Sequence, residues 1–155
     1  MIPSNVNAWS PHPVPIDSPG FSILDHPADL GIEARGRNLG EAFEQAALGL
    51  TSIIIDPATI TPSERIVVEL TASDRQQLLV RWLSEILYFY DAKGFVARRF
   101  EVKFLTDKSL RAEMRGESLC LEKHITRLDV KAVTYHQLQV EENASGGHIR
   151  VYVDI

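Results

Sequence analysis

The order of the extended segments along the chain constrains the fold more than any other feature. Residues 95–105 and 110–115 have the alternating apolar pattern of strands, and only a polar turn at 106–109 separates them. Residues 130–140 and the last strand, built on the apolar run 149–153, are joined by a similarly short polar connection. Strands joined by short turns pair antiparallel, because parallel pairing needs a long crossover. An α+β fold is therefore predicted, with three further short strands at residues 21–24, 30–36 and 65–70.

Two segments have the periodicity of amphipathic helices. The first begins after Asn38, a favourable N-cap, and Glu41 completes a capping-box pattern. The second begins at Ser73 or Asp74 and ends at Gly94. We therefore expect a mainly antiparallel sheet of about seven strands with two amphipathic helices. The predicted apolar stripes are Leu39, Ala42, Phe43, Ala46, Ala47, Leu50, Ile53 and Ile54 in the first helix, and Leu78, Leu79, Trp82, Leu83, Ile86, Phe89 and Tyr90 in the second.

Composition divides the chain into two parts. Residues 1–20 hold five of the eight prolines and are expected to form a disordered leader. Residues 21–155 are expected to form a single domain, long enough to bury a core. The first residues lack the pattern of a signal peptide, and no apolar run approaches the length of a membrane span. A cytoplasmic location is therefore expected, and the single Cys120 fits a reducing compartment as a small buried hydrophobe.

Charge and motifs exclude several classes of function. The net charge of -5 and the pI near 5.5 argue against direct binding of nucleic acid through its phosphates. The nucleotide-binding loops, the zinc-protease motif and the hydrolase nucleophile turn are all absent from the sequence.

The chain ends in two adjacent carboxylates, those of Asp154 and of the terminal residue Ile155. Oxygen ligands of this kind suit Mg²⁺, Ca²⁺ or Mn²⁺ rather than zinc. A solvated acidic end is the alternative interpretation. Asp29, in a short loop at 25–29, is similarly either a turn former or a metal ligand or general base. Lys131, close to Asp129, either forms a surface salt bridge or has a functional role.

Four blocks of sequence, in the right order, resemble the archease family. The first combines residues 25–32 (DHPADLGI), Gly36 and residues 39–50 (LGEAFEQAALGL). The others are residues 78–88 (LLVRWLSEILY), 130–136 (VKAVTYH) and 151–155 (VYVDI), so that the likeness extends from about Phe21 to Ile155. Two features depart from the family pattern: Pro27 stands where a threonine is common, and the proline-rich leader lies outside it.

The resemblance implies a protein cofactor, not an enzyme in its own right. Archeases activate the RtcB-type RNA ligase of tRNA splicing and RNA repair by promoting guanylylation of the ligase's own histidine, which allows multiple turnover. The resemblance also implies a divalent-cation site made by Asp29, Asp154 and the carboxylate of Ile155, with Lys131 as a functional neighbour. Two modes of action remain open, which are delivery or repositioning of the metal and remodelling of the ligase by binding.

Two other functions remain as alternatives, a stand-alone metal-dependent phosphohydrolase and a non-catalytic chaperone or scaffold. The proposed site makes two demands on the structure. The first and last strands must lie close together so that Asp29 and Asp154 can share one ion, and both acids should be partly exposed around it.

Overall fold

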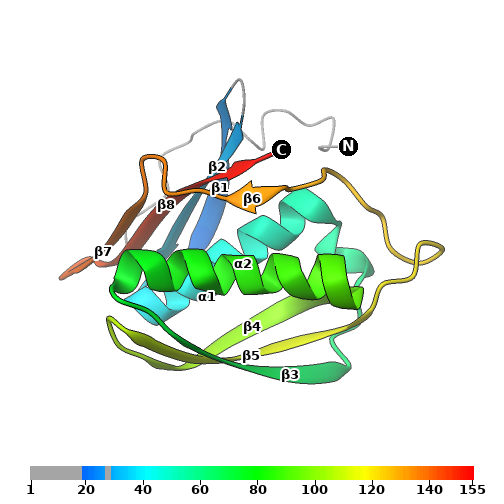
Figure 1. Cartoon of the computed structure of the whole chain (residues 1–155), viewed down its shortest axis with the longest axis horizontal. Helices are drawn as coiled ribbons and strands as arrows, with labels where there is room; N and C mark the ends of the chain where they lie inside the picture. Colours follow the sequence, from blue (N-terminus) through cyan, green and yellow to red (C-terminus); the bar gives the residue numbers. More distant parts are fainter. Residues whose placement is uncertain (1–18, 27–28) are drawn as a thin grey trace.

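The computed structural model describes residues 19–26 and 29–155 (Figure 1). Side chains are described except at positions 25 and 26. The predicted leader therefore lies almost wholly outside the described residues, and Gly20 already belongs to the first strand. In chain order the elements are β1 (Gly20–His26), β2 (Asp29–Gly36), α1 (Leu39–Ile54), the short 3₁₀ helix η2 (Pro57–Thr59), β3 (Glu64–Thr71), α2 (Arg75–Lys93), β4 (Phe95–Leu105), β5 (Ser109–Ser118), β6 (Ala132–Val133), β7 (Gln139–Asn143) and β8 (Gly146–Asp154).

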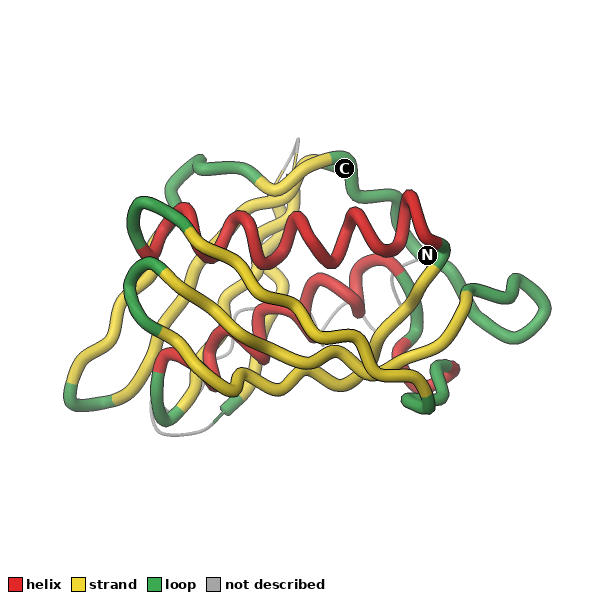
Figure 2. The backbone as a smooth tube through the Cα atoms, turned by 60° about the horizontal axis from the view of Figure 1, so that its bottom comes forward, coloured by secondary structure: helices red, strands yellow, loops and turns green. Residues whose placement is uncertain are grey.

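The predicted α+β class is confirmed, with the described strands divided between two antiparallel sheets. The first sheet has the order β1-β2-β8-β6, and β7 also pairs with β8. The second has the order β3-β5-β4. Figures 1 and 2 show both helices between the two sheets, and α1 contacts strands of both. No helix in the described part of the chain is long and apolar enough to cross a membrane.

Local signals position α1 as predicted. The Asn38 side chain accepts a hydrogen bond from the Glu41 N–H (2.8 Å), and the Glu41 carboxylate accepts one from the Arg37 N–H (3.1 Å), one residue before the cap. All the residues of the predicted apolar stripe are buried. A Cβ at Gly49 would lie 2.9 Å from Ile32 Cγ2, so the glycine allows α1 to pack closely against β2. A helix between two sheets buries more than one face, and this explains why Thr51 and Ser52 are buried as well.

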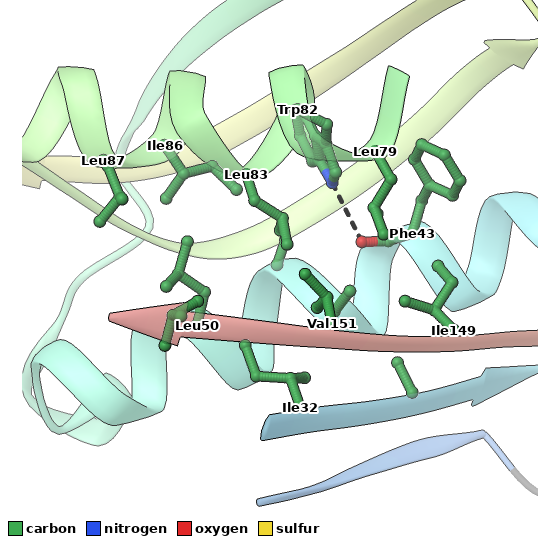
Figure 3. Packing of buried hydrophobic residues seen from close by; sticks show 14 of the residues in the cluster. Ile32, Phe43, Leu50, Leu79, Trp82, Leu83, Ile86, Leu87, Ile149 and Val151 are labelled. Carbon is green, nitrogen blue, oxygen red and sulfur yellow. Dashed lines mark hydrogen bonds between the residues drawn. The ribbon is translucent and has the colours of Figure 1, made fainter. Parts of the chain in front are cut away.

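The second helix is also bounded as predicted. Asp74, rather than Ser73, caps α2 by accepting a hydrogen bond from the Gln77 N–H (2.8 Å), and Gly94 ends it in the left-handed conformation (φ 59°). Figure 3 shows the indole N–H of Trp82 donating to the carbonyl oxygen of Phe43 in α1, at 3.0 Å. This bond satisfies the polar atom of a completely buried side chain and ties the two helices together.

The predicted strand at residues 130–140 is wrong as a single element. Val133 pairs with Val153 and Gln139 pairs with Arg150, so the five residues 134–138 lie opposite only two residues of β8. The surplus loops out, with Gln137 at φ 50°. The predicted loop at 25–29 is also shorter than expected, because β1 continues to His26.

The long connection between β5 and β6 is organised by a buried histidine. His124 Nδ1 accepts a hydrogen bond from the Cys120 N–H (2.9 Å), so Nε2 is the donor toward Glu117 Oε2 (2.8 Å). Glu117 also accepts from Lys123 (2.9 Å) and from the Thr61 N–H (2.8 Å). The Cys120 side chain is exposed, so its predicted burial is wrong. The contribution of Cys120 to this loop is the hydrogen bond that its backbone N–H donates to His124.

Candidate metal centre

Asp29 and Asp154 meet where β2 begins and β8 ends. They are Cα partners in the antiparallel β2–β8 pair, which places their Cβ atoms about 4.5–5.5 Å apart on one face of the sheet. Leu30 and Val153 point into the core between the sheets, so the two carboxylates lie on the opposite face. The expectation that the first and last strands lie close together needs one correction. The last strand, β8, pairs with β2, which carries Asp29, and β1 lies on the other side of β2.

The two acids differ in exposure. Asp154 is exposed, whereas Asp29 is only 8% exposed. The expectation that both would be partly exposed is therefore wrong for Asp29. Asp29 lies inside the sheet between two paired strands, with His26 of β1 as its Cα partner on one side and Asp154 on the other. Asp154 is the acid of this pair that faces solvent.

Lys131 reaches the same end of the sheet through its backbone. Its N–H donates to the carbonyl oxygen of Asp154 at 2.8 Å, and Ala132 is the Cα partner of Asp154 in the β6–β8 pair. Asp154 is thus flanked by Asp29 on one side and by the start of β6 on the other. The Lys131 side chain is exposed and belongs to the segment adjacent to the chain end.

The ligands predicted at this end are all oxygen atoms. They are the side chains of Asp29 and Asp154, which are strand partners, and the terminal carboxylate of Ile155, whose part in a site stays a prediction. Among the side chains that the structure describes, those of residues 19–24 and 29–155, no group of three or more His, Cys, Asp or Glu is arranged to hold a metal ion. The third ligand of the predicted set is a main-chain carboxylate rather than a side chain. A hard, anionic donor set of this kind fits Ca²⁺, Mg²⁺ or Mn²⁺.

Tyr152 and Gly31 form the next pair along the same face. A Cβ at Gly31 would lie 2.8 Å from Cε1 of Tyr152, so the glycine makes room for the ring. The ring is buried and also contacts His136, with the ring centroids 5.9 Å apart. Sequence reasoning assigned no role to Tyr152. Tyr152 lies two residues before Asp154 on β8, so both side chains are on the same face of the sheet. This spacing is the feature of the sequence that could have connected Tyr152 with the site.

Glu33 lies one pair further from the chain end and is surrounded by basic side chains. Its carboxylate accepts from Arg150 (2.8 Å) and Arg35 (2.8 Å), and His148 lies 3.7 Å away. Partial burial opposes ionisation of Glu33, but the bond and charge of Arg150, with the charges of Arg35 and His148, outweigh it and lower its pKa. Glu33 is thus paired with these arginines and is not free to bind a further cation. His148, which had no distinguishing neighbour in the sequence, belongs to this cluster.

The remaining histidine and aspartate candidates do not contribute to the end of the sheet where Asp29 and Asp154 meet, or their side chains are outside the described part of the structure. The side chains of Asp25 and His26, in the predicted loop, lie outside it. His124 uses both ring nitrogens in hydrogen bonds with Cys120 and with Glu117 of β5.

Residues 21–155 match the archease protein family. Among proteins with similar sequences, the archease of Sulfolobus acidocaldarius is 38% identical over 136 residues, which cover 87% of this chain and 98% of that protein. The archease of Methanosarcina acetivorans is 36% identical over 146 residues, which cover 92% of this chain and 100% of the relative.

Two solved structures have a similar fold. The solution structure of protein 1598 from Methanobacterium thermoautotrophicum matches with a TM-score of 0.75 and 34% identity, covering 88% of this chain and 99% of the other. The crystal structure of an archease from Thermotoga maritima, described as a possible chaperone, matches with a TM-score of 0.60, covering 85% of this chain and 94% of the other. At 20% identity, the second similarity concerns the fold alone.

Proposed function

The chain belongs to the archease family, and from this premise we propose that it activates an RtcB-type RNA ligase in the cytoplasm. In this role it promotes guanylylation of the ligase's histidine and allows the ligase to turn over repeatedly. It is an accessory protein in tRNA splicing and RNA repair, and it does not itself join RNA.

The meeting of Asp29 and Asp154 is the observation that carries the proposal. Like charges directly opposite each other on paired strands destabilise a sheet unless a cation or donors compensate them. Asp29 is buried in this position and Asp154 is next to the terminal residue, so any compensating cation has access from the Asp154 side. The pair therefore favours a protein that holds an ion at its surface, where a partner can reach it.

Asp29, Asp154 and the terminal carboxylate of Ile155 are the residues that would hold this divalent cation. When bound, the ion would supply positive charge for binding the phosphates of a nucleotide in the partner's active site. Asp29 orients the set, because its backbone is fixed between β1 and β8. Asp154 is held by strand partners on both sides, so the chain end is ordered rather than frayed. The Lys131 side chain, which is exposed, would interact with the ligase or its nucleotide beside the ion.

The test is a ligase assay with the cognate RtcB-type enzyme, GTP and Mn²⁺. We expect stoichiometric protein to raise both the rate of guanylylation and the number of RNA ends joined per ligase molecule. Unchanged values of both quantities would contradict the proposal.

The same preparation separates the alternatives. Hydrolysis of a phosphoester by the purified protein alone, lost in Asp29→Ala, would indicate a phosphohydrolase. Protection of an unrelated unfolded protein from aggregation, together with no effect on the ligase, would indicate the chaperone function that the description of the Thermotoga maritima protein suggests.

A further inference from the structure

Strand β3 is an edge strand with an open side. Among the described strands it pairs with β5 alone. The Ala72 N–H donates to the Lys108 carbonyl (2.8 Å) and continues the β3–β5 register. Because hydrogen-bonded and non-hydrogen-bonded positions alternate in antiparallel pairs, Arg65, Val67 and Glu69 direct their backbone N–H and C=O groups away from β5. Their side chains are all exposed on the face turned away from the helices.

The other edge of the same sheet is protected. Helix α1 lies against β4, and the Glu44 carboxylate accepts a hydrogen bond from the Val102 N–H at 2.7 Å. At β3 the comparable contact is at the strand's end, where Arg81 of α2 donates to the Thr71 carbonyl at 2.8 Å. An open edge strand is a template for pairing with another extended segment.

We propose that β3 pairs with β3 of a second copy of this chain, antiparallel about a two-fold axis at Val67, to form a continuous six-stranded sheet. In this register Val67 is opposite the partner's Val67. Arg65 is opposite the partner's Glu69, and symmetry repeats this ion pair on the other side of the axis.

The charges on β3 select this register. Only every second residue of β3 has free backbone N–H and C=O groups at the edge, and these residues must pair with each other. The two-fold axis can therefore lie only at the position of a residue, and the positions near the middle of β3 are Ile66, Val67 and Val68. With the axis at Ile66, Val67 would be opposite the partner's Arg65, and with the axis at Val68 it would be opposite the partner's Glu69. Only the axis at Val67 places valine against valine and both charges against their opposites.

The surroundings of Arg65 favour an acidic partner. Arg65 is the cross-strand partner of Arg115, which is in turn the partner of Arg99, so three arginines form one row across the sheet. Like charges opposite each other are unfavourable, and Arg65 (3.4 Å) and Arg115 (3.8 Å) share one carboxylate, that of Glu113. The partner's Glu69 would extend this row with a negative charge, and pairing would cover Val67, which is 41% exposed.

A single added strand pair is a small interface, so association should depend on concentration. Sedimentation equilibrium of the full chain, from about 1 μM to about 1 mM, spans the range in which such interfaces dissociate. The expected mass rises over this range from 17.4 kDa to twice that value. This readout needs no ligase, so it is independent of the proposed function.

Two charge reversals test the register. Arg65→Glu gives an edge with two acids and Glu69→Arg gives an edge with two arginines, so each variant alone should remain monomeric. An equimolar mixture of the two should form a heterodimer, and the double variant R65E/E69R should dimerise like the wild type. Lys103→Glu and Glu101→Arg are matched controls, because these residues are exposed on β4 and pair with each other there.

The outcomes decide the proposal. Recovery of the dimer in the mixture and in the double variant would support this register and would show that the single variants are folded. A wild type that stays monomeric throughout would overturn the proposal and leave the edge to a segment of a different protein. A dimer that the single reversals do not weaken, or one that the mixture does not restore, would place the interface elsewhere.

Discussion

Asp29 and Asp154 lie directly opposite each other on paired antiparallel strands, although they come from opposite ends of the chain. The first residue of β2 and the last residue of β8 are thereby brought onto one face of the sheet. This relationship brings the end of β8 to the candidate site and places the two acids in different environments, because Asp29 is buried and Asp154 is exposed.

The difference in burial predicts different costs of removing the two carboxylates. In the presence of a chelator, Asp154→Ala should melt at or slightly above the wild-type temperature, since relief of repulsion contributes about 0.2–1 kcal/mol. Asp29→Ala should lower the free energy of unfolding by about 1–3 kcal/mol, because it leaves the groups that interact with this buried side chain without their partner, and this cost exceeds the gain from relief of repulsion. Thermal melts of the three proteins in chelator measure this order, and a larger loss for Asp154→Ala would contradict it.

A C-terminal extension should weaken binding of divalent metal. One added residue converts the terminal carboxylate of Ile155 into a neutral amide carbonyl and moves the charge about 3.3 Å along the strand direction. A tag of the same composition at the N-terminus leaves the carboxylate in place and serves as the control. Calorimetric titration with Mn²⁺ should give a weaker affinity for the C-terminally tagged protein alone. Equal affinities would show that Asp29 and Asp154 act without the chain end.

Gly31→Ala should destabilise the protein, because the added Cβ would lie 2.8 Å from the buried ring of Tyr152. Overpacking of this kind costs about 1–3 kcal/mol. Gly20→Ala is the matched control, since a Cβ at Gly20 meets nothing within 4 Å. Urea denaturation compares the two variants, and similar stabilities would mean that the Tyr152 ring can move aside without cost.

The loop held by His124 should contribute to stability in a defined range of pH. Hydrogen bonds from Lys123, the Thr61 backbone and His124 lower the pKa of Glu117 from 4.5 to about 2. Glu117 therefore takes up a proton near pH 4.5 in the unfolded chain, but only near pH 2 in the folded protein. The contribution of Glu117 is complete above pH 4.5 and is lost as the pH falls toward 2.

Glu117→Gln tests this dependence. Between pH 4.5 and 2 the stability of the wild type should fall more steeply than that of the variant, as measured by urea denaturation at each pH. Glu122→Gln, an exposed position in the same loop, should follow the wild type. Parallel curves for wild type and Glu117→Gln would indicate that the folded loop does not stabilise the ionised carboxylate.

Local signals were sufficient to predict the helices and the β4–β5 hairpin. Asn38, Asp74 and Gly94 mark helix ends through contacts within a few residues, so sequence alone identifies them. The order of the strands depends on contacts between distant segments. The sequence therefore did not indicate that β2, rather than β1, would lie next to β8, or that the strands would divide into two sheets.

The errors have similar physical causes. The alternating pattern at residues 130–140 is compatible with one strand. It does not indicate that residues 134–138 lie opposite only two residues of β8, so that three residues are in excess and the segment forms a loop. The proximity of Asp29 to Asp154 was expected from the family resemblance, not from periodicity. The burial of Asp29 depends on its position between two strand partners and could not be inferred from its neighbours in sequence.

Ligase activation by Asp154→Asn protein tests the central claim most directly. The variant keeps the size of the side chain at an exposed position and removes one of the two opposed charges. Asp91→Asn, an exposed site on α2, is the control. The account predicts that wild type and Asp91→Asn raise the guanylylation rate of the cognate RtcB-type ligase, whereas Asp154→Asn leaves it at the level of the ligase alone. Full activation by Asp154→Asn would contradict the account.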